Sequence, residues 1–372
     1  MKHRWHIVSF DNPWPPDYGG AMDVFYKLKY LAEAGVEVRL HFFSYGRQEY
    51  APLKAWAKEI RVYPRPRKPG DLMSVKPFIV QSRERDALLK NLKADDLPIL
   101  FEGIHTTGFA DELTERNMWL RAHNVESRYY RSLGAAEKNP LKKLFFYGEA
   151  LKLKAYEEKT ARKMKGVFAV HPRDRDFFAR RNARSVWIPV FHPFDKVEVP
   201  AETEAFVLFH GNLSVAENVA AVRYLQEKVM RHLPYDFIVA GKNPARGLEK
   251  LKRDKNFRLV PNPSAEKMAD LIRRARVHLL YAPQQAGMKL KLLHVLYRGN
   301  RVVVNPAMVE NTFLEPAVHL ARTPEEMREA VRESMRMPKP DEKEIRRRKE
   351  LLYAYYHNGT NIQKIIDHVE QA

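Results

Sequence analysis

An alternation of short apolar runs with segments of helical period, present in both halves of the chain, limits the possible folds more than any other feature. The first units show it clearly. Residues 6–10 are apolar, residues 21–31 carry apolar side chains at helical spacing, and Gly35 ends that helix. Residues 36–42 then alternate as a strand does. Such βαβ units build parallel sheets covered by helices.

The same pattern predicts further strands in each half. They are residues 60–63, 98–101, 118–122 and 167–170 in the first half, and 205–209, 237–240, 257–260, 277–280 and 302–304 in the second. A length of 372 residues suits two domains of ordinary size. We therefore expect an α/β protein with two Rossmann-like, doubly wound parallel-sheet domains that face each other across a cleft. Ligands of such sheets bind in the loops that follow the strands.

Composition shifts suggest where the domains divide. We expect an N-terminal domain over residues 1–190, a proline-containing linker over 191–200, and a second domain over 201–340. Residues 341–372 form a final helix, broken near residues 357–361, with no strand after it. We expect this helix to cross back and pack on the N-terminal domain.

Composition also excludes several classes of function. The chain has no cysteine, which excludes disulfides, thiolate nucleophiles and cysteine-based metal sites. A formal net charge of +19 favours anionic partners such as diphosphates, anionic lipid surfaces or nucleic acid. No apolar stretch is long enough to span a bilayer, and residues 5–10 are too short for a signal-peptide core. The expected location is the cytoplasm.

Two candidate ligand-binding segments follow strands of the first domain. Gly19 and Gly20 lead directly into a helix, where backbone N–H groups can meet an anion, although a simple turn that caps the helix would need the same residues. His123 follows the strand 118–122 beside polar Asn124 and Glu126, a position where its imidazole can donate or accept a hydrogen bond. A purely structural histidine is the alternative.

The second domain offers three equivalent segments. Gly211 and Asn212 follow its first strand and Lys242 follows its second, and this equivalent placement favours one shared pocket, although simple turns would explain each segment equally well. In the segment 284–294 a strand ends, a glycine turns the chain, and a helix begins with Lys289 in its first turn. A lysine there makes sense if an anion such as a diphosphate is bound. A solvated lysine face is the alternative.

Other motifs are absent or weak. Asp174 and Asp176 spell a D-x-D sequence, but a helix would point them in different directions, and neighbouring arginines neutralise them. There is no H-E-x-x-H, Walker loop or G-x-G-x-x-G, so protease, NTPase and dehydrogenase functions lack their motifs.

Two basic clusters could rest on an anionic membrane surface. They are Arg61, Arg65, Arg67, Lys68 and Lys76 in the first, and Lys142, Lys143, Phe145 and Phe146 in the second, which lies in a helical stretch over 126–164. A solvated loop and a buried helix face are the alternatives.

Together these segments resemble the retaining GT-B glycosyltransferases of glycosyltransferase family 4, including bacterial group 1 sugar transferases. The resemblance covers nearly the whole chain and rests on four short motifs in order. They are residues 17–20, residues 121–126, residues 209–212 with Asn218, and residues 287–293 with Arg298-Gly299.

The resemblance implies a GT-B fold, an N-terminal acceptor domain and a C-terminal nucleotide-sugar domain. It also implies metal-independent transfer of a hexose from a UDP- or GDP-sugar to a glycan or lipid-linked acceptor, with no cofactor. The catalytic residues it implies are His123 and Lys289. The residues implied for the donor and its diphosphate are Gly19, Gly20, Gly211, Asn212, Lys242, Gly287, Met288, Lys291 and His294. Nucleic acid is not an expected partner.

The sequence departs from the family at one important point. Such enzymes usually carry two glutamates eight positions apart around this glycine, where this chain has Ala286 and His294. An active polysaccharide-building transferase and a catalytically degenerate GT-B binding protein for polysaccharide, lipid or a partner enzyme are therefore both compatible with the sequence.

Overall fold

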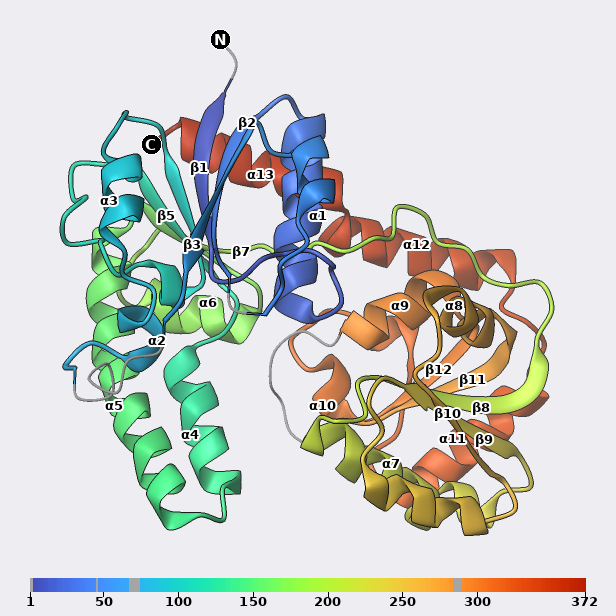
Figure 1. Cartoon of the computed structure of the whole chain (residues 1–372). Coiled ribbons are helices and arrows are strands. Elements are labelled where there is room, and N and C mark those ends of the chain that lie inside the picture. Colours follow the sequence, from blue (N-terminus) through green and yellow to red (C-terminus); the bar gives the residue numbers. More distant parts are fainter. Residues whose placement is uncertain (1–2, 45, 67–73, 284–289) are drawn as a thin grey trace. The chain divides into compact units, whose positions relative to one another are not determined.

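The computed structural model describes residues 3–44, 46–66, 74–283 and 290–372. The chain divides into two compact units. Unit 1 comprises Met1–Pro193 and Tyr356–Ala372, and unit 2 comprises Phe194–Tyr355. Each unit contains one sheet with helices packed against it, which confirms the expected two-domain α/β fold (Figure 1).

The sheet of unit 1 has the strand order β3-β2-β1-β4-β5-β6-β7, and all neighbouring strands are parallel. Its strands are β1 (Arg4–Ser9), β2 (Glu37–Ser44), β3 (Glu59–Pro64), β4 (Ile99–Glu102), β5 (Met118–Ala122), β6 (Gly166–Ala169) and β7 (Ser185–Trp187). The strand order reverses between β1 and β4. In open α/β sheets this is the point where the loops diverge and leave room for a ligand.

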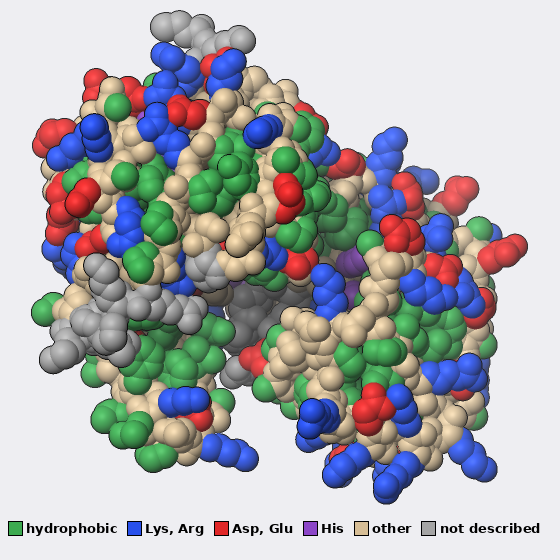
Figure 2. Space-filling view, viewed as in Figure 1, with side chains coloured by type: hydrophobic (Ala, Val, Ile, Leu, Met, Phe, Trp, Pro, Cys, Tyr) green, Lys and Arg blue, Asp and Glu red, His purple; other side chains and the backbone are tan. Residues whose placement is uncertain are grey.

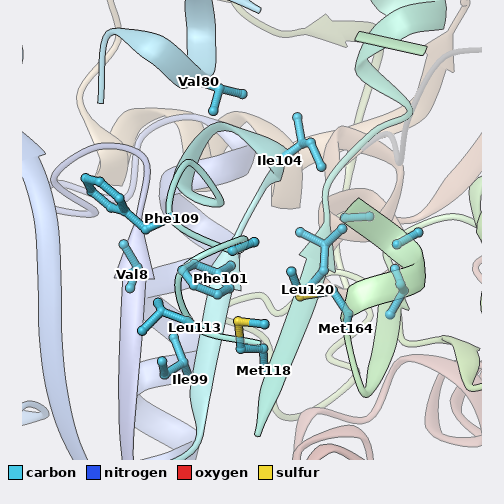
Figure 3. Packing of buried hydrophobic residues seen from close by; sticks show 14 of the residues in the cluster. Val8, Val80, Ile99, Phe101, Ile104, Phe109, Leu113, Met118, Leu120 and Met164 are labelled. Atoms are coloured by element: carbon cyan, nitrogen blue, oxygen red, sulfur yellow. The ribbon is translucent and has the colours of Figure 1, made fainter. Parts of the chain in front are cut away.

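Alternate side chains of these strands enter two separate cores. Val8 and Phe101 belong to the cluster on one face, and Ile7 and Leu100 belong to the cluster on the other. Figure 3 shows the first cluster, in which Val8, Phe101, Leu120 and their neighbours pack together. Because a strand alternates its side chains between the two faces of the sheet, both faces need covering helices.

Those helices come from both ends of the chain. The helices of unit 1 are α1 (Gly19–Glu33), α2 (Phe78–Gln81), α3 (Asp86–Leu92), α4 (Glu126–Ala136), α5 (Pro140–Lys163), α6 (Pro172–Ala179) and α13 (Asn358–Glu370). Leu28 of α1 and Ile365 of α13 lie in one core, and Leu153 of α5 and Phe178 of α6 lie in the other. The last helix thus completes the core of the first unit.

Unit 2 repeats the architecture with a six-stranded parallel sheet in the order β10-β9-β8-β11-β12-β13. Its strands are β8 (Glu204–His210), β9 (Asp236–Gly241), β10 (Phe257–Pro261), β11 (Ala275–Leu280), β12 (Arg301–Val304) and β13 (His319–Leu320). Its helices are α7 (Ala216–Lys228), α8 (Ala265–Arg274), α9 (Leu290–Arg298), α10 (Pro306–Val309), α11 (Pro324–Arg336) and α12 (Glu342–Tyr356). The order reverses between β8 and β11.

The C-terminal segment consists of two helices rather than one. α12 belongs to unit 2 up to Tyr355, whereas α13 belongs to unit 1. The break falls at His357, whose side chain accepts a hydrogen bond from the backbone N–H of Thr360 and so caps α13. The chain therefore crosses between the units at this capped break.

Helices α4 and α5 form an antiparallel hairpin that extends beyond the sheet of unit 1 (Figure 1). The connection is short because Asn139 caps α5 with its side-chain oxygen and Pro140 occupies the first helical position. At the base of the hairpin, the buried side-chain carboxyl group of Glu157 on α5 accepts the backbone N–H of Glu126 at 2.6 Å. It thereby caps α4.

None of the helices in the described ranges is long and apolar enough to cross a bilayer.

Candidate functional site

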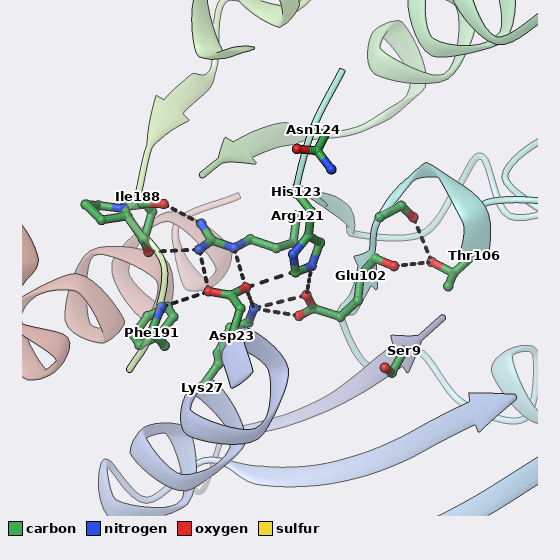
Figure 4. Close-up of polar contacts among 12 residues, drawn as sticks. Ser9, Asp23, Lys27, Glu102, Thr106, Arg121, His123, Asn124, Ile188 and Phe191 are labelled. Carbon is green, nitrogen blue, oxygen red and sulfur yellow. Dashed lines mark hydrogen bonds and ion pairs between the residues drawn. The ribbon is translucent and has the colours of Figure 1, made fainter. Parts of the chain in front are cut away.

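A buried network of charges lies at the carboxyl ends of β4 and β5 in unit 1 (Figure 4). Lys27 Nζ on α1 lies 2.8 Å from Asp23 Oδ2, one turn earlier on the same helix, and 2.9 Å from Glu102 Oε1. Glu102 is the last residue of β4. These three side chains are fully buried, so each charge depends on its partners for stabilisation.

Arg121 of β5 supplies the second buried cation. Its Nε and Nη2 atoms donate to the two oxygens of Asp23 at 3.0 and 2.8 Å, and its remaining N–H groups donate to the carbonyls of Ile188 and Pro189. Burial alone would raise the pKa of Asp23, but the charges of Arg121 and Lys27 hold that pKa well below its usual range. Two carboxylates and two cations thus form a compensated set.

His123 stands at the edge of this network. Its Nε2 atom lies 3.0 Å from Glu102 Oε2, and 12% of its side chain is exposed. When the carboxylate accepts the Nε2 proton, Nδ1 remains as an acceptor. The edge contact of the imidazole with the Phe10 ring, at 5.3 Å between centroids, further fixes its orientation. The predicted histidine is therefore a partly exposed imidazole held by a buried carboxylate.

The glycine pair is close to the same aromatic ring. A Cβ on Gly20 would lie 2.6 Å from Phe10 Cζ, so a side chain at this position would clash with the residue that contacts His123. Gly19 is exposed at the first position of α1. Packing thus accounts for Gly20, and a ligand contact by either glycine stays a prediction.

Asp23, Glu102 and His123 have ligand atoms within 4.8 Å of one another, as in a metal site. However, Lys27 Nζ already lies between the two carboxylates at 2.8 and 2.9 Å. An ammonium in that position occupies the space and supplies the charge that a cation would bring. These residues therefore fit a metal poorly.

In unit 2, the predicted donor-site residues gather where β8 and β9 end. The backbone N–H of Gly211 donates to Ala240, and the side-chain amide of Asn218 donates to the carbonyl of Asn212 at 2.9 Å. Lys291 of α9 reaches the same point, with Nζ 2.9 Å from Asn218 Oδ1 and 4.6 Å from the centre of the Phe209 ring. The structure therefore brings Gly211, Asn212 and Lys291 together.

His294 lies one helical turn further along α9 and is half-buried. Its ring lies 4.8 Å from that of Phe194 and 5.7 Å from that of His210. Burial lowers the pKa of His294 to about 4, so the imidazole is neutral at pH 7. A neutral imidazole offers one donor and one acceptor, whereas the glutamate usual at this position in the resembling family offers acceptors alone.

The predicted Lys242 is exposed and follows β9 at Gly241. A Cβ on Gly241 would lie 1.8 Å from the carbonyl oxygen of Gly211, so the two strand-end turns are in backbone contact. The predicted Gly287, Met288 and Lys289 lie outside the described residues, as does Ala286.

We expect Gly241→Ala to destabilise unit 2 by at least about 2 kcal/mol, because a backbone carbonyl has to move to admit the methyl group. Gly148→Ala is the matched control, because its Cβ meets nothing within 4 Å and alanine favours the helix over glycine. Chemical denaturation followed by circular dichroism measures both changes. Equal stability of Gly241→Ala and the wild type would contradict the contact between the two turns.

The discounted D-x-D sequence lies on α6. Asp174 pairs with Arg128 at 3.6 Å, and Asp176 pairs with the adjacent Arg175 at 2.9 Å. The two carboxylates thus serve separate ion pairs.

The network of unit 1 contains residues that sequence reasoning missed as site residues, namely Asp23, Lys27 and Glu102. A signal was present in the sequence. Asp23 and Lys27 interrupt the apolar face of α1 with opposite charges four positions apart, and Glu102 ends an otherwise apolar strand. Charged residues inside an apolar pattern indicate buried ion pairs or functional groups.

The two sheets with their strand orders and loops define the GT-B fold, the fold of a large class of glycosyltransferases. Sucrose-phosphate synthase from Thermosynechococcus elongatus superposes with a TM-score of 0.68 at 13% identity, covering 99% of this chain and 98% of that one. Anabaena HepE, solved with UDP and glucose, gives 0.67 at 10% identity and full coverage of both chains. The pneumococcal O-GlcNAc transferase GtfA, solved with UDP and GlcNAc, gives 0.65 at 9% identity, covering 100% of this chain and 99% of that one.

Among curated proteins, the chain is 26% identical over 328 residues to a Klebsiella pneumoniae protein described as an uncharacterized 44.6 kDa protein in the cps region. The similarity covers 81% of this chain and 82% of that protein. No family model matches the sequence. The structural similarities confirm the GT-B fold expected from the four motifs.

Proposed function

We propose that this protein is a metal-independent, retaining glycosyltransferase that moves a hexose from a UDP- or GDP-sugar to a glycan or lipid-linked acceptor. The observation that carries the proposal is the grouping of Gly211, Asn212, Asn218 and Lys291 where two adjacent strands of unit 2 end. Amides and a lysine at such a point suit a nucleoside diphosphate. HepE and GtfA, which share the fold, were solved with UDP and a sugar.

The reaction needs charge neutralisation more than proton transfer. As the bond between the anomeric carbon and the diphosphate oxygen breaks, negative charge collects on the leaving group and positive charge on the sugar. In this proposal Lys289 and Lys291 neutralise the diphosphate, with Gly287, Met288 and Lys242 around it. His123, oriented by Glu102, hydrogen-bonds the sugar through Nδ1, and His294 hydrogen-bonds the ribose. The lysine between Asp23 and Glu102 supports metal independence.

We propose that the acceptor belongs to surface-polysaccharide synthesis. This proposal rests on the relative from Klebsiella pneumoniae, which is described by its place in the cps (capsule) region. In that setting the protein works in the cytoplasm and contacts the anionic inner face of the membrane. The net charge of +19 supports such a contact.

One observation favours a second candidate function, a GT-B binding protein without catalysis. His294 is a neutral imidazole where the resembling family has a carboxylate, and it packs against Phe194 and His210. In this second candidate function, unit 2 holds a glycan, a lipid or a partner enzyme without promoting bond cleavage.

A thermal-shift panel with UDP, GDP and their hexose conjugates tests the proposal. At about 100 times the dissociation constant, a ligand should add about 2.7 kcal/mol of stability. We expect a shift with one nucleotide family that is reduced in Lys289→Ala and Lys291→Ala and retained in Lys250→Ala, an exposed lysine of the same unit. Duplex DNA serves as the control for nonspecific binding of anions.

The nucleotide that binds is then used in a turnover assay for release of the nucleoside diphosphate. We expect His123→Ala to lower turnover by roughly 100-fold while the thermal shift persists. Binding without turnover in the wild type would favour the binding protein. No shift with any nucleotide would refute both the donor site and the transferase.

A further inference from the structure

The α4–α5 hairpin exposes a set of large apolar side chains that the fold of unit 1 does not use. Leu141, Leu144 and Leu151 are 78%, 71% and 68% exposed, and Tyr147 and Tyr129 are also exposed. Figure 2 shows hydrophobic side chains gathered on this projecting part of the molecule. Leucines are ordinarily among the most buried residues, and contiguous exposed apolar patches indicate interaction sites.

These side chains lie on one face of α5. Residues 141, 144, 147 and 151 follow one another at spacings of three and four, which aligns them along the helix. The opposite face carries Leu153, Glu157 and Ala161, which are buried in unit 1. α5 therefore has one apolar face for the core and a second apolar face turned to the surface.

The leucines, and not the phenylalanines of the second basic cluster, form this surface. Phe145 and Phe146 are half-buried, and the Phe146 ring packs against Tyr130 of α4 at 6.0 Å between centroids. Phe146 thus links the two helices, and Phe145 packs against Phe146 at 5.7 Å between ring centroids. Contact of these two rings with a membrane stays a prediction.

A basic pocket of about 290 Å³ lies on the same face of α5, nearer the base of the hairpin. Its lining contains five cationic side chains and one carboxylate, and consists of Ser127, Arg128, Arg131, Lys154, Glu158, Phe177, Arg180 and Arg181. Glu158 pairs with Arg181 at 2.9 Å and Asp174 pairs with Arg128 at 3.6 Å, which leaves Arg131, Lys154 and Arg180 as an excess of positive charge. Lys154 follows Leu151 by three residues, so the leucine face runs directly into the pocket.

The leucines and the pocket lie on the same face of α5, so a bilayer surface can contact both when the helix lies along it. At about 1.5 Å per residue, this face extends roughly 20 Å along the helix from Leu141 to Lys154. Amphipathic helices at membranes bury an apolar face at the boundary of head groups and acyl chains and keep cations among the head groups. We propose that the hairpin inserts its exposed leucines into an anionic bilayer and that the basic pocket binds a lipid phosphate.

The surroundings of the leucines favour a bilayer over a protein partner. Lys138, Lys142 and Lys143 are exposed at the tip, next to Leu141 and Leu144. Lysine is depleted in the cores of protein interfaces, whereas at a membrane its long side chain extends to the head groups while its stem lies on apolar surface. The inference rests on the proposed function, because it names the surface that makes the proposed membrane contact. Binding of this surface to a membrane does not require sugar transfer.

Sedimentation with vesicles of phosphatidylcholine alone or with phosphatidylglycerol tests the insertion. We expect the wild type to bind the anionic vesicles, and Leu144→Gln/Leu151→Gln to bind them at least tenfold more weakly with no change in net charge. Met337→Gln, at an exposed apolar position of unit 2, is the matched control and should bind as the wild type does. Circular dichroism checks that each variant is folded.

Arg131→Gln/Arg180→Gln tests the pocket. We expect it to weaken binding to anionic vesicles about tenfold or more and to leave binding to neutral vesicles unchanged. The nucleotide thermal shift should be the same in all these variants, which separates this proposal from the donor site. Wild-type affinity of the leucine variant for vesicles, or a wild-type dimer that the leucine variant converts to a monomer, would overturn the proposal.

Discussion

Asp23→Ala is expected to destabilise unit 1 by about 3–5 kcal/mol, because it leaves Arg121 and Lys27 buried without their shared carboxylate. The same side chain also accepts the backbone N–H of Phe191 at 2.8 Å, so that the variant loses a further buried hydrogen bond. All five tryptophans of the chain lie in unit 1. Urea denaturation followed by tryptophan fluorescence therefore reports the unfolding of this unit selectively.

Glu33→Ala is the control for this effect on the same helix. Glu33 pairs with Lys29 at 3.7 Å, but 45% of its side chain is exposed, and such surface pairs contribute roughly 0.3–0.5 kcal/mol. If Asp23→Ala cost less than about 1 kcal/mol, the buried charges would have to be hydrated or neutral. The compensated network described above would then be wrong.

The second large effect is a dependence of stability on pH that runs in opposite directions in the two units. On the acid side, burial lowers the pKa of His41 and His278 to about 3 and that of His294 to about 4. Burial also lowers the pKa of His6, His105 and His210. Below pH 6.5 the unfolded chain binds more protons at these histidines than the folded chain does. Their contribution to stability is therefore present above pH 6.5 and is lost on acidification, by up to about 1.4 kcal/mol per pH unit and group.

Three buried acids act in the opposite direction. Burial raises the pKa of Glu157 to about 8, that of Glu126 to about 7 and that of Asp174 to about 6. Each acid keeps its proton in the folded protein, so its contribution is present below its ordinary pKa of about 4 and is lost as the pH rises through the raised value. His210, His278 and His294 lie in unit 2, whereas the three acids lie in unit 1 with the other three histidines. Unit 2 should therefore lose stability below pH 6.5, and unit 1 should lose stability above it, as Glu126 and Glu157 release their protons.

Urea denaturation between pH 5 and 9 checks both directions, with tryptophan fluorescence for unit 1 and circular dichroism for the whole chain. Glu157→Gln keeps an acceptor for the backbone N–H of Glu126 and should make unit 1 lose less stability from pH 5 to about 8, the range between the ordinary and the raised pKa of Glu157. His232→Gln, at an exposed position, should leave both profiles unchanged. A flat profile of unit 2 from pH 5 to 7 would show that its buried histidines bind protons in the folded protein.

The candidate sites were only partly predictable from the sequence. His123 was predicted from its place after a strand, but its orientation by Glu102 requires β4 and β5 to be neighbours in the sheet. The gathering of Gly211, Asn212 and Lys291 also follows from topology, because α9 begins some 80 residues after β8 ends. Asp23 and Lys27 carried a signal in the apolar face of α1, but Arg121 as their partner comes from a strand about 100 residues away.

By itself the sequence determined the order of the elements and the α/β class, because hydrophobic periodicity is a local property that the chain carries whatever its neighbours are. The periodicity did not predict the strands β7 and β13, because they span only three and two residues. These strands form by pairing with the edges of β6 and β12. Only the tertiary structure decided which charges are buried together, that α12 belongs to unit 2 while α13 alone packs in the core of unit 1, and that the leucines of α5 remain outside that core. Those outcomes depend on contacts between distant segments, and no local pattern specifies which segments meet.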